Sequence, residues 1–368
     1  MKKCIVRTLL ALAASFVGVA SQSALAQDEL FVGNAGNNSV TVFSRTASGN
    51  TAPIRTLVGA ATGLSFIQGL AVDATNNELF VANGSGPTIT VYGLNASGNT
   101  APLRTLTGAA TGLGQPVYLA VDTINNELVV ANGGNQTITS YSRTASGNTA
   151  PLRTLSTVPA GNTPIGLTLD LTNNELIIGT SGSTIDVYSR TASGNTPILR
   201  SLGGVSTGLS APRGLGVDPT NNELFVASTG NSSVPVFGRT ASGNTAPLRT
   251  LSGAATGLVF PQPLTLDLTN NEMFVGNTGS ANSITAYTRG ASGNTAPLRT
   301  LSGVVTGISG PIGIAVTTGV APPPPPSAAV NVPTLSEWAQ ISLALLLALG
   351  GLVALRGAQQ GTLGRPTE

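Results

Sequence analysis

The sequence has few of the residues on which enzymes and nucleic-acid-binding proteins usually depend. It has no histidine, its one cysteine is Cys4, and its only two lysines are Lys2 and Lys3. Charged residues make up 9% of the chain. After Cys4, disulfides, thiol chemistry and histidine-based catalysis are therefore excluded. Because no basic stretch provides the electrostatic footprint of a nucleic-acid-binding protein, we expect no nucleic acid partner. We also expect no cofactor and no metal.

A repeat fills most of the chain. Its clearest marker is a glutamate, and successive copies of it lie 48 or 49 residues apart, at Glu29, Glu78, Glu127, Glu175, Glu223 and Glu272. Each copy holds four short apolar runs, named a to d here, which in the second copy are 70–72, 79–81, 89–92 and 103–106. The runs are rich in β-branched and aromatic residues and are bounded by Gly, Asn, Ser and Pro, which is typical of strands. This pattern predicts an all-β protein, either a β-propeller or a solenoid.

The two ends of the repeat region favour a closed propeller. The first copy begins with run b at 29–32, and the last copy supplies only run a, at 313–316. A C-terminal run a can complete the N-terminal blade, which gives six blades and leaves no long sheet edge exposed. A solenoid would need capping copies at both ends, and the sequence shows none. We therefore predict a six-bladed β-propeller over 27–318, with run a innermost because its middle residue is always small.

The segments that flank the repeats predict export. Residues 1–26 have a basic start, an apolar core and a small-residue end, which is the pattern of a cleaved signal peptide. After the repeats, 319–331 is a Pro-rich linker. An uncharged and largely apolar span follows at 339–355, and we expect it to cross the membrane as a helix with Arg356 on the cytoplasmic side. A buried or amphipathic helix is the alternative for this span.

The tail also carries a short motif. Its residues are Val332, Pro333, Thr334, Leu335 and Trp338, and the apolar span and a basic end follow them. This order resembles the IPTL-CTERM sorting signal of Gram-negative bacteria, with valine in place of the first isoleucine. Over 332–368, the resemblance implies export, transient tethering in the inner membrane, an exosortase-like processing enzyme as a partner, and a final location at the cell surface or outside the cell.

The repeats are similar to NHL-type propeller repeats. In those repeats a Gly-Ile-Ala-Val-Asp strand precedes a second strand ending in Val-Ala-Asp or Val-Ala-Asn, and here the second strand ends in residues such as Asn34, Asn83 and Asn132. This resemblance concerns the fold and does not fix a function.

Repeated charges raise the question of a metal site. Five aspartates end run a, and they could form a calcium-binding ring at one mouth of the channel: Asp73, Asp122, Asp170, Asp218 and Asp267. Alternatively, each one caps the Thr-Asn-Asn type of turn that follows it. The sixth run a has no such turn after it and ends in Thr317 instead, which favours the local role. Arginines at the end of run c, such as Arg45 and Arg143, adjoin the repeated glutamates that begin run b of the same copy. They predict a rim of exposed ion pairs, each worth less than about 1 kcal/mol.

One face of the predicted propeller varies more than the other. Because the runs alternate in direction, the a–b and c–d turns lie on one face and the b–c and d–a loops on the other. The first is nearly invariant, whereas the second carries Gln68, Tyr118, Arg213 and Gln262 close to the start of run a. Diversity on one face of a repeat scaffold is where a binding site usually lies, although unselected loops also drift. We predict that these four residues contact an unknown surface ligand. Because Arg213 is a cation, an anionic or polar ligand is favoured.

These features predict an exported propeller that acts as a non-catalytic binding or structural module. The alternative is a calcium-dependent, lactonase-like hydrolase on the same fold. Catalysis needs groups that are set apart from their copies, and the only unrepeated charges in the propeller are Asp28, Asp186 and Arg213.

Overall fold

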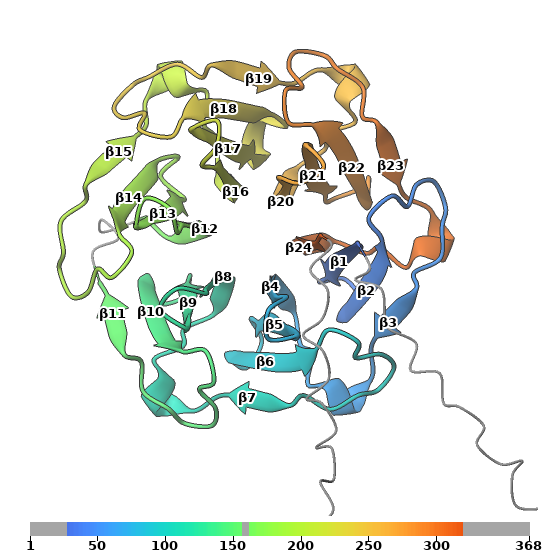
Figure 1. Cartoon of the computed structure of the whole chain (residues 1–368), viewed down its shortest axis with the longest axis vertical. Coiled ribbons are helices and arrows are strands. Elements are labelled where there is room, and N and C mark those ends of the chain that lie inside the picture. Colours follow the sequence, from blue (N-terminus) through green and yellow to red (C-terminus); the bar gives the residue numbers. More distant parts are fainter. Residues whose placement is uncertain (1–27, 157–161, 319–368) are drawn as a thin grey trace, which may run out of the picture. The chain divides into compact units, whose positions relative to one another are not determined.

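The computed structural model describes residues 28–156 and 162–318. These residues form six four-stranded antiparallel sheets arranged as blades around a central channel (Figure 1). The fold is therefore the predicted all-β, six-bladed propeller. The predicted signal peptide, linker, sorting residues and transmembrane span lie outside the described residues. Within 28–156 and 162–318, no helix combines the length and apolar character that crossing a membrane requires.

Each blade has four strands, and we number the blades 1 to 6 from the one that contains β1. The innermost strands of blades 1 to 6 are β24 (Pro311–Thr317), β4 (Ile67–Asp73), β8 (Pro116–Asp122), β12 (Pro164–Asp170), β16 (Pro212–Asp218) and β20 (Pro261–Asp267). The second strands are β1 (Glu29–Asn34), β5 (Glu78–Asn83), β9 (Glu127–Asn132), β13 (Glu175–Thr180), β17 (Glu223–Ser228) and β21 (Glu272–Asn277).

The two outer tiers continue each sheet. The third strands are β2 (Ser39–Ser44), β6 (Thr88–Gly93), β10 (Thr137–Ser142), β14 (Ile185–Ser189), β18 (Val234–Gly238) and β22 (Ser283–Thr288). The short outermost strands are β3 (Arg55–Leu57), β7 (Arg104–Leu106), β11 (Arg153–Leu155), β15 (Arg200–Leu202), β19 (Arg249–Leu251) and β23 (Arg299–Leu301). Single 3-10 turns lie in the connecting loops: η1 (Ala60–Thr62), η2 (Ala109–Thr111), η3 (Val205–Thr207), η4 (Thr229–Asn231), η5 (Ala254–Thr256) and η6 (Val304–Thr306).

The two ends of the described region meet in blade 1. Strand β24 pairs antiparallel with β1, from Glu29 opposite Thr317 to Phe31 opposite Ala315 and onward to Asn34 opposite Pro311. The last described strand thus completes the sheet that the first described strand begins, as predicted, and both edges of β1 are paired. Ring closure therefore depends on the pairing of two strands whose residues are almost 300 positions apart, as Glu29 and Thr317 are.

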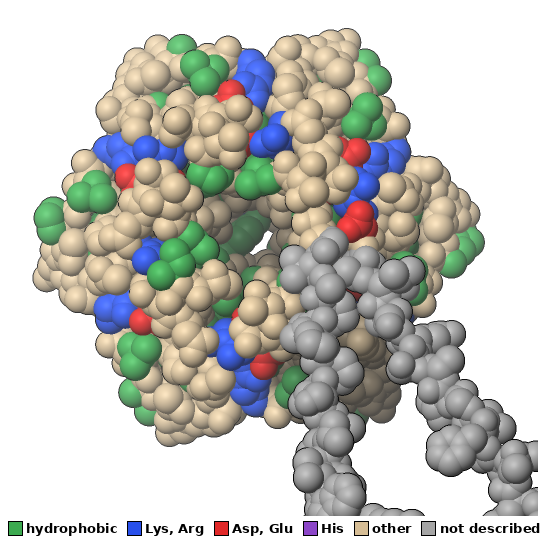
Figure 2. Space-filling model, in the orientation of Figure 1, with side chains coloured by type: hydrophobic (Ala, Val, Ile, Leu, Met, Phe, Trp, Pro, Cys, Tyr) green, Lys and Arg blue, Asp and Glu red, His purple; other side chains and the backbone are tan. Residues whose placement is uncertain are grey.

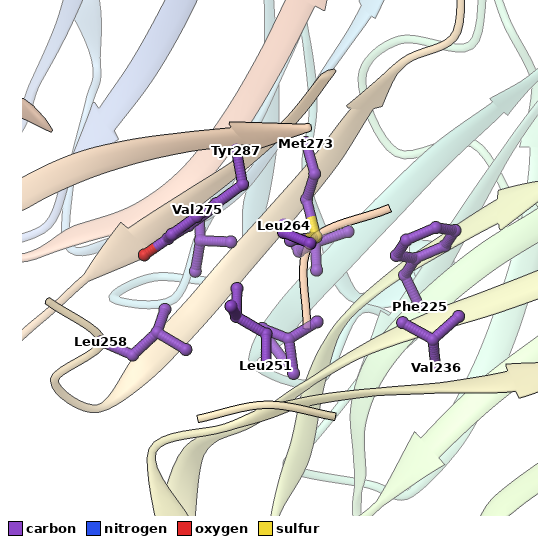
Figure 3. Packing of buried hydrophobic residues seen from close by; sticks show 11 residues of the cluster. Phe225, Val236, Leu251, Leu258, Leu264, Met273, Val275 and Tyr287 are labelled. Carbon is purple, nitrogen blue, oxygen red and sulfur yellow. The ribbon is translucent and has the colours of Figure 1, made fainter. Parts of the chain in front are cut away.

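The hydrophobic core is divided among the interfaces between blades. In the interface of blades 5 and 6, Phe225 and Val236 on one blade pack against Leu264, Met273 and Tyr287 on the next (Figure 3). All five side chains are buried. Each blade therefore buries its faces only when its neighbours are present, which makes the ring a single cooperative unit.

The long segment between the third and fourth strands of each blade (the c–d segment) forms hydrogen bonds with the preceding blade. In blade 2 this segment runs along the outermost strand of blade 1, where the Gly98 N–H donates to the Thr56 carbonyl at 2.7 Å and the Val58 N–H donates to the Gly98 carbonyl at 2.9 Å. Asn99 then accepts a hydrogen bond from the Ala61 N–H at 2.7 Å, at the opposite face of the ring. The expectation that the c–d segment stays on one face is therefore wrong, because the repeated Ser-Gly-Asn-Thr sequence follows the outer edge of the neighbouring blade. Between blades 6 and 1 the same contact is made by Gly49 and Asn50.

Candidate functional site

The face formed by the a–b turns, called the uniform face below, holds the ion pairs of the propeller. In every blade the arginine that begins the outermost strand pairs with the glutamate that begins the second strand: Arg55, Arg104, Arg153, Arg200, Arg249 and Arg299. Arg200, for example, donates to both carboxylate oxygens of Glu175, at 2.6 and 2.7 Å. Figure 2 shows acidic and basic side chains side by side around the ring on this face, with the channel at its centre.

These pairs differ from the predicted rim in partner and in exposure. The predicted partner was the arginine after the third strand of the same blade, but the arginine of the outermost strand reaches over that strand instead. Its guanidinium also lies over an aromatic ring in four blades, as Arg104 does over Phe80 at 5.5 Å. The glutamate side chains are only 9–15% exposed. Solvent therefore screens these pairs less than it screens surface ion pairs.

The arginine after the third strand connects neighbouring blades. Arg45 of blade 1 donates to Glu272 of blade 6 at 2.6 Å and lies 3.5 Å from Asp267 of that blade. Arg143 makes the same contacts with Glu78 and Asp73 of the preceding blade. Burial alone would raise the pKa of Glu78, but Arg104 and Arg143 together hold it below its ordinary value. Arg190, Arg239 and Arg289 continue the pattern around the ring.

The interface between blades 1 and 2 lacks this connection. At the position of the aspartate, blade 1 has Thr317, and at the position of the arginine, blade 2 has Leu94. Five of the six interfaces therefore have both members of the pair, and the sixth has neither. An unpaired buried charge is costly, and losing both members together avoids that cost.

The five aspartates serve the turns and these arginines. Asp73 accepts hydrogen bonds from the backbone and side-chain amides of Asn76, at 3.1 and 2.7 Å. Asp267 does the same with Asn270, at 2.9 and 2.8 Å. These contacts match the local role rather than a calcium ring. In 28–156 and 162–318, no three His, Cys, Asp or Glu side chains are grouped so as to hold a metal ion.

The central channel contains a cavity of about 260 Å³. Its wall is made of the innermost strands and of small residues such as Ala71, Ala120 and Thr265. The outer edge of each innermost strand pairs within its own blade, so the inner edges turn their backbone groups toward the axis. Neither Asp nor Glu nor Arg belongs to the cavity lining. The wall of this cavity can therefore offer hydrogen bonds but no charge.

Tyr118 crosses this channel from blade 3. Its hydroxyl donates to the Gln262 carbonyl of blade 6, on the opposite side of the ring, at 3.3 Å. Burial raises the pKa of the Tyr118 hydroxyl, and the nearby charge of Arg213 offsets part of that rise. The structure thus brings Tyr118, Arg213 and the backbone of Gln262 together where the channel reaches the face of the b–c and d–a loops, called the variable face below.

The side chains of the two glutamines, Gln68 and Gln262, lie apart from the channel. The Gln262 amide donates to the Thr278 hydroxyl of its own blade at 3.0 Å. Gln68 is 8% exposed, and its side chain covers Gly84 in the b–c loop of blade 2. The side chains of Gln68 and Gln262 therefore turn toward the b–c loop of their own blade, which the alternation of the sequence does not reveal because a β-bulge interrupts the strand pairing at this point. Whether these four residues bind a ligand stays a prediction.

Two phenylalanines on the variable face were missed from the sequence. Phe66 and Phe260 precede the innermost strands of blades 2 and 6, with φ of 50° and 46°, and they are 47% and 55% exposed. Residues other than glycine are uncommon in this left-handed region. The available signal was the Phe-x-Gln sequence, which in these loops occurs only at 66–68 and 260–262.

Comparison with known families identifies the tail. The IPTL-CTERM motif matches residues 332–357, which include all five predicted sorting residues. This match points to export and sorting to the cell surface, and it implies processing by an exosortase-like system. The predicted NHL type of the repeats is not confirmed.

Comparison with solved structures supports the propeller. The chain is similar to a chain in the crystal structure of a nidogen/laminin complex, with a TM-score of 0.61 and 18% identity over 80% of this chain and 99% of that one. It is also similar to a functionally unknown protein from Desulfotomaculum acetoxidans DSM 771 (TM-score 0.54, 14% identity, 80% and 100% covered). A third similar structure is the WD40 β-propeller domain of Doa1 (TM-score 0.50, 14% identity, 75% and 83% covered).

At these identities the structural likeness shows the fold alone, and no curated protein matches the chain. The chain is thus a six-bladed propeller followed by an IPTL-CTERM motif.

Proposed function

We propose that this exported protein acts at the cell surface as a non-catalytic binding or structural module, and that the variable face is its binding face. The sorting motif supports the location. The propeller supports the role, because a closed ring of six blades holds many loops on a rigid scaffold. The similar propeller in a nidogen/laminin complex is consistent with such a role and indicates no partner for this chain.

The distribution of charge is the observation that carries this proposal. Among the described arginines, every one except Arg213 takes part in a salt bridge on the uniform face. Those arginines connect blades and strands and are occupied by their partners. Arg213 lies on the variable face beside the channel, within electrostatic range of Tyr118. The cation that remains available is therefore on the face where the loops differ, and there it would attract an anionic or polar ligand.

The hydrolase alternative receives less support. It needs a cation held by unlike acidic and amide groups in the channel, whereas the cavity wall has no acidic side chain. The aspartates nearest to the channel mouth accept hydrogen bonds from their own turns and form salt bridges with arginines.

The tail would deliver the propeller to the surface in steps. We expect 1–26 to direct export and 339–355 to stop in the inner membrane, since moving Arg356 through hydrocarbon is costly. Pro333 would keep the motif extended and accessible to a membrane-embedded processing enzyme. Replacing Pro333-Thr334-Leu335 with alanines should then leave the full-length protein in the inner membrane. Mass spectrometry of the mature C-terminus tests this, and full-length protein in the medium of the native host would contradict it.

Single cysteines can test the surface location, because the chain has only Cys4. In a Cys4→Ser background, Ser85→Cys places a thiol at an exposed position of the variable face and Thr75→Cys places one at an exposed position of the uniform face. We expect a membrane-impermeant maleimide to label both variants on intact cells of the native host. Deleting 332–368 should move the labelled protein away from the cell surface. Labelling only after lysis would contradict the proposal.

A further inference from the structure

We propose that Phe66 and Gln68 of blade 2 form a binding subsite for a neutral sugar ring. The proposal rests on the proposed role of the variable face, and it names both the ligand chemistry and the residues that would recognise it. It is carried by three observations: an exposed aromatic ring, an unpartnered amide beside it, and loops without charge.

The ring of Phe66 is exposed, and the backbone that carries it is held in place. The residue is 47% exposed, yet both of its backbone polar groups are engaged. Its N–H donates to Asn38 of blade 1 at 2.6 Å, and its carbonyl accepts from the Gly84 N–H at 3.0 Å. At the equivalent position blade 1 has Gly310, with φ of 57°, so a residue without a side chain suits this backbone. The phenylalanine therefore presents an apolar ring to solvent at a position that does not require one.

The amide of Gln68 lies beside this ring. A Cβ added to Gly84 would be 2.9 Å from Gln68 Cγ, 3.2 Å from Phe66 Cδ1 and 3.4 Å from Gln68 Nε2, so both side chains cover the same glycine. Gln68 is only 8% exposed, and its amide makes no hydrogen bond within the described residues, although solvent still reaches its atoms. A bound hydroxyl group would take the place of water there, because an amide both donates and accepts.

The surroundings favour a neutral ligand. The loops around the pair, at 35–38, 59–66 and 84–88, contain no charged residue. A phosphate or carboxylate would find no cation there, whereas an aliphatic side chain would leave the Gln68 amide without a partner. A sugar ring satisfies both groups, since it has a face of C–H bonds that can pack on the phenylalanine ring and a rim of hydroxyls that can reach the amide.

Blade 6 provides a natural comparison. It has the same two residue types, Phe260 and Gln262, and Phe260 lies over Gly279 as Phe66 lies over Gly84. However, the Gln262 amide already donates to Thr278 at 3.0 Å. Blade 6 thus has the exposed ring without the free amide, and we expect weaker binding there.

The test uses the full-length protein and a panel of neutral oligosaccharides, namely hexamers of glucose, mannose, galactose and N-acetylglucosamine. Dissociation constants are measured by titration calorimetry for each sugar that binds. Phe66→Gly removes the ring and suits the left-handed backbone, so the variant should fold. We expect it to weaken binding at least tenfold, and Gln68→Met to weaken it three- to tenfold. Phe260→Gly is the matched control and should weaken binding less than threefold.

Three results would overturn the proposal: binding of no sugar in the panel, binding by Phe66→Gly that equals the wild type, or equal losses in Phe66→Gly and Phe260→Gly. Thermal melting of each variant establishes that it is folded. Phe66-dependent binding of an uncharged peptide instead of a sugar would overturn the ligand class. Because the cysteine-labelling experiment measures location without any ligand, failure of the sugar subsite and failure of the proposed function can be distinguished.

Discussion

The two faces of the propeller use polar residues differently. On the uniform face, arginines and acids are paired within and between blades, and they are largely buried, as Arg45 and Glu272 are at side-chain exposures of 12 and 11%. On the variable face, Arg213 has no acidic partner in the described residues and Gln68 has no hydrogen-bond partner there. The first face therefore stabilises the ring, and the second has polar groups that remain available to a ligand.

The comparison shows why repetition alone is a poor guide to function. Residues such as Arg143 and Asp73 recur because each interface between blades needs them, and they disappear together where Leu94 and Thr317 stand. Residues such as Tyr118 and Phe66 differ between blades, so the contacts that are repeated at every interface do not depend on them. In a ring of copies, the positions that depart from the repeat are better candidates for binding than the positions that keep it.

The largest expected effect concerns closure, which supports both faces at once. Ending the chain at Gly310 removes β24 and leaves the inner edge of β1 unpaired. We expect a loss of more than about 4 kcal/mol in the free energy of unfolding, with aggregation through the exposed edge. Thermal melting and light scattering measure both effects. A chain that ends at Thr318 is the control, since it also lacks the tail but keeps β24. Equal stability of the two truncations would contradict closure by this strand.

The next effect concerns the connection between blades. Arg143→Leu introduces the residue that blade 2 has naturally at Leu94, and it leaves Asp73 without its arginine. We expect a cost of about 2–4 kcal/mol. Adding Asp73→Asn should recover about 1 kcal/mol, because no buried charge then lacks a partner. Urea unfolding of both single variants and the double variant measures this coupling. Additive effects would show that the two side chains do not interact.

A smaller effect is the dependence of stability on pH, which has opposite signs for the acids of the uniform face and for Asp186. Hydrogen bonds and charge from Arg299 and Arg45 hold the pKa of Glu272 below its ordinary value, so its contribution to stability is present above the unfolded pKa and is lost as pH falls. Asp186 is 3% exposed, and burial raises its pKa. Its carboxylate therefore reduces stability as pH rises from the unfolded pKa of about 4.

Asp186→Thr tests this opposite sign. Threonine stands at the equivalent position in blades 1, 2, 3 and 6. We expect the variant to gain about 1 kcal/mol at pH 7, and the gain to shrink toward zero near pH 3, where both states of the wild type bind the proton. Denaturant unfolding across this pH range measures the difference. A gain that is independent of pH would show that ionisation of Asp186 is not its cause.

The blade number and the closure of the ring could be predicted from the sequence because each depends on a pattern along the chain. The glutamate spacing counts the copies, and the missing first run a together with the spare last one determines how the ring closes. The turn-capping role of the aspartates was also predictable, since Asp73 and Asn76 are neighbours in sequence.

The ion-pair partners and the candidate site could not be predicted in this way. Arg45 and Glu272 are 227 residues apart and meet only because blades 6 and 1 are neighbours in the closed ring. Tyr118 meets the backbone of Gln262 only because blades 3 and 6 face each other across the channel. The left-handed backbone of Phe66, held by Asn38 of the preceding blade, likewise results from packing between blades and has no local signature.

The most direct test of the difference between the faces compares two arginines of blade 5. Arg239 pairs with Glu175 at 3.0 Å on the uniform face, whereas Arg213 has no salt bridge among the described residues and lies on the variable face. The free energies of unfolding of Arg239→Ala and Arg213→Ala are measured by urea titration under identical conditions. We expect a loss of about 2 kcal/mol or more for Arg239→Ala and a change within about 0.5 kcal/mol for Arg213→Ala. Equal losses in the two variants would contradict the account, because Arg213 would then stabilise the ring as the repeated arginines do.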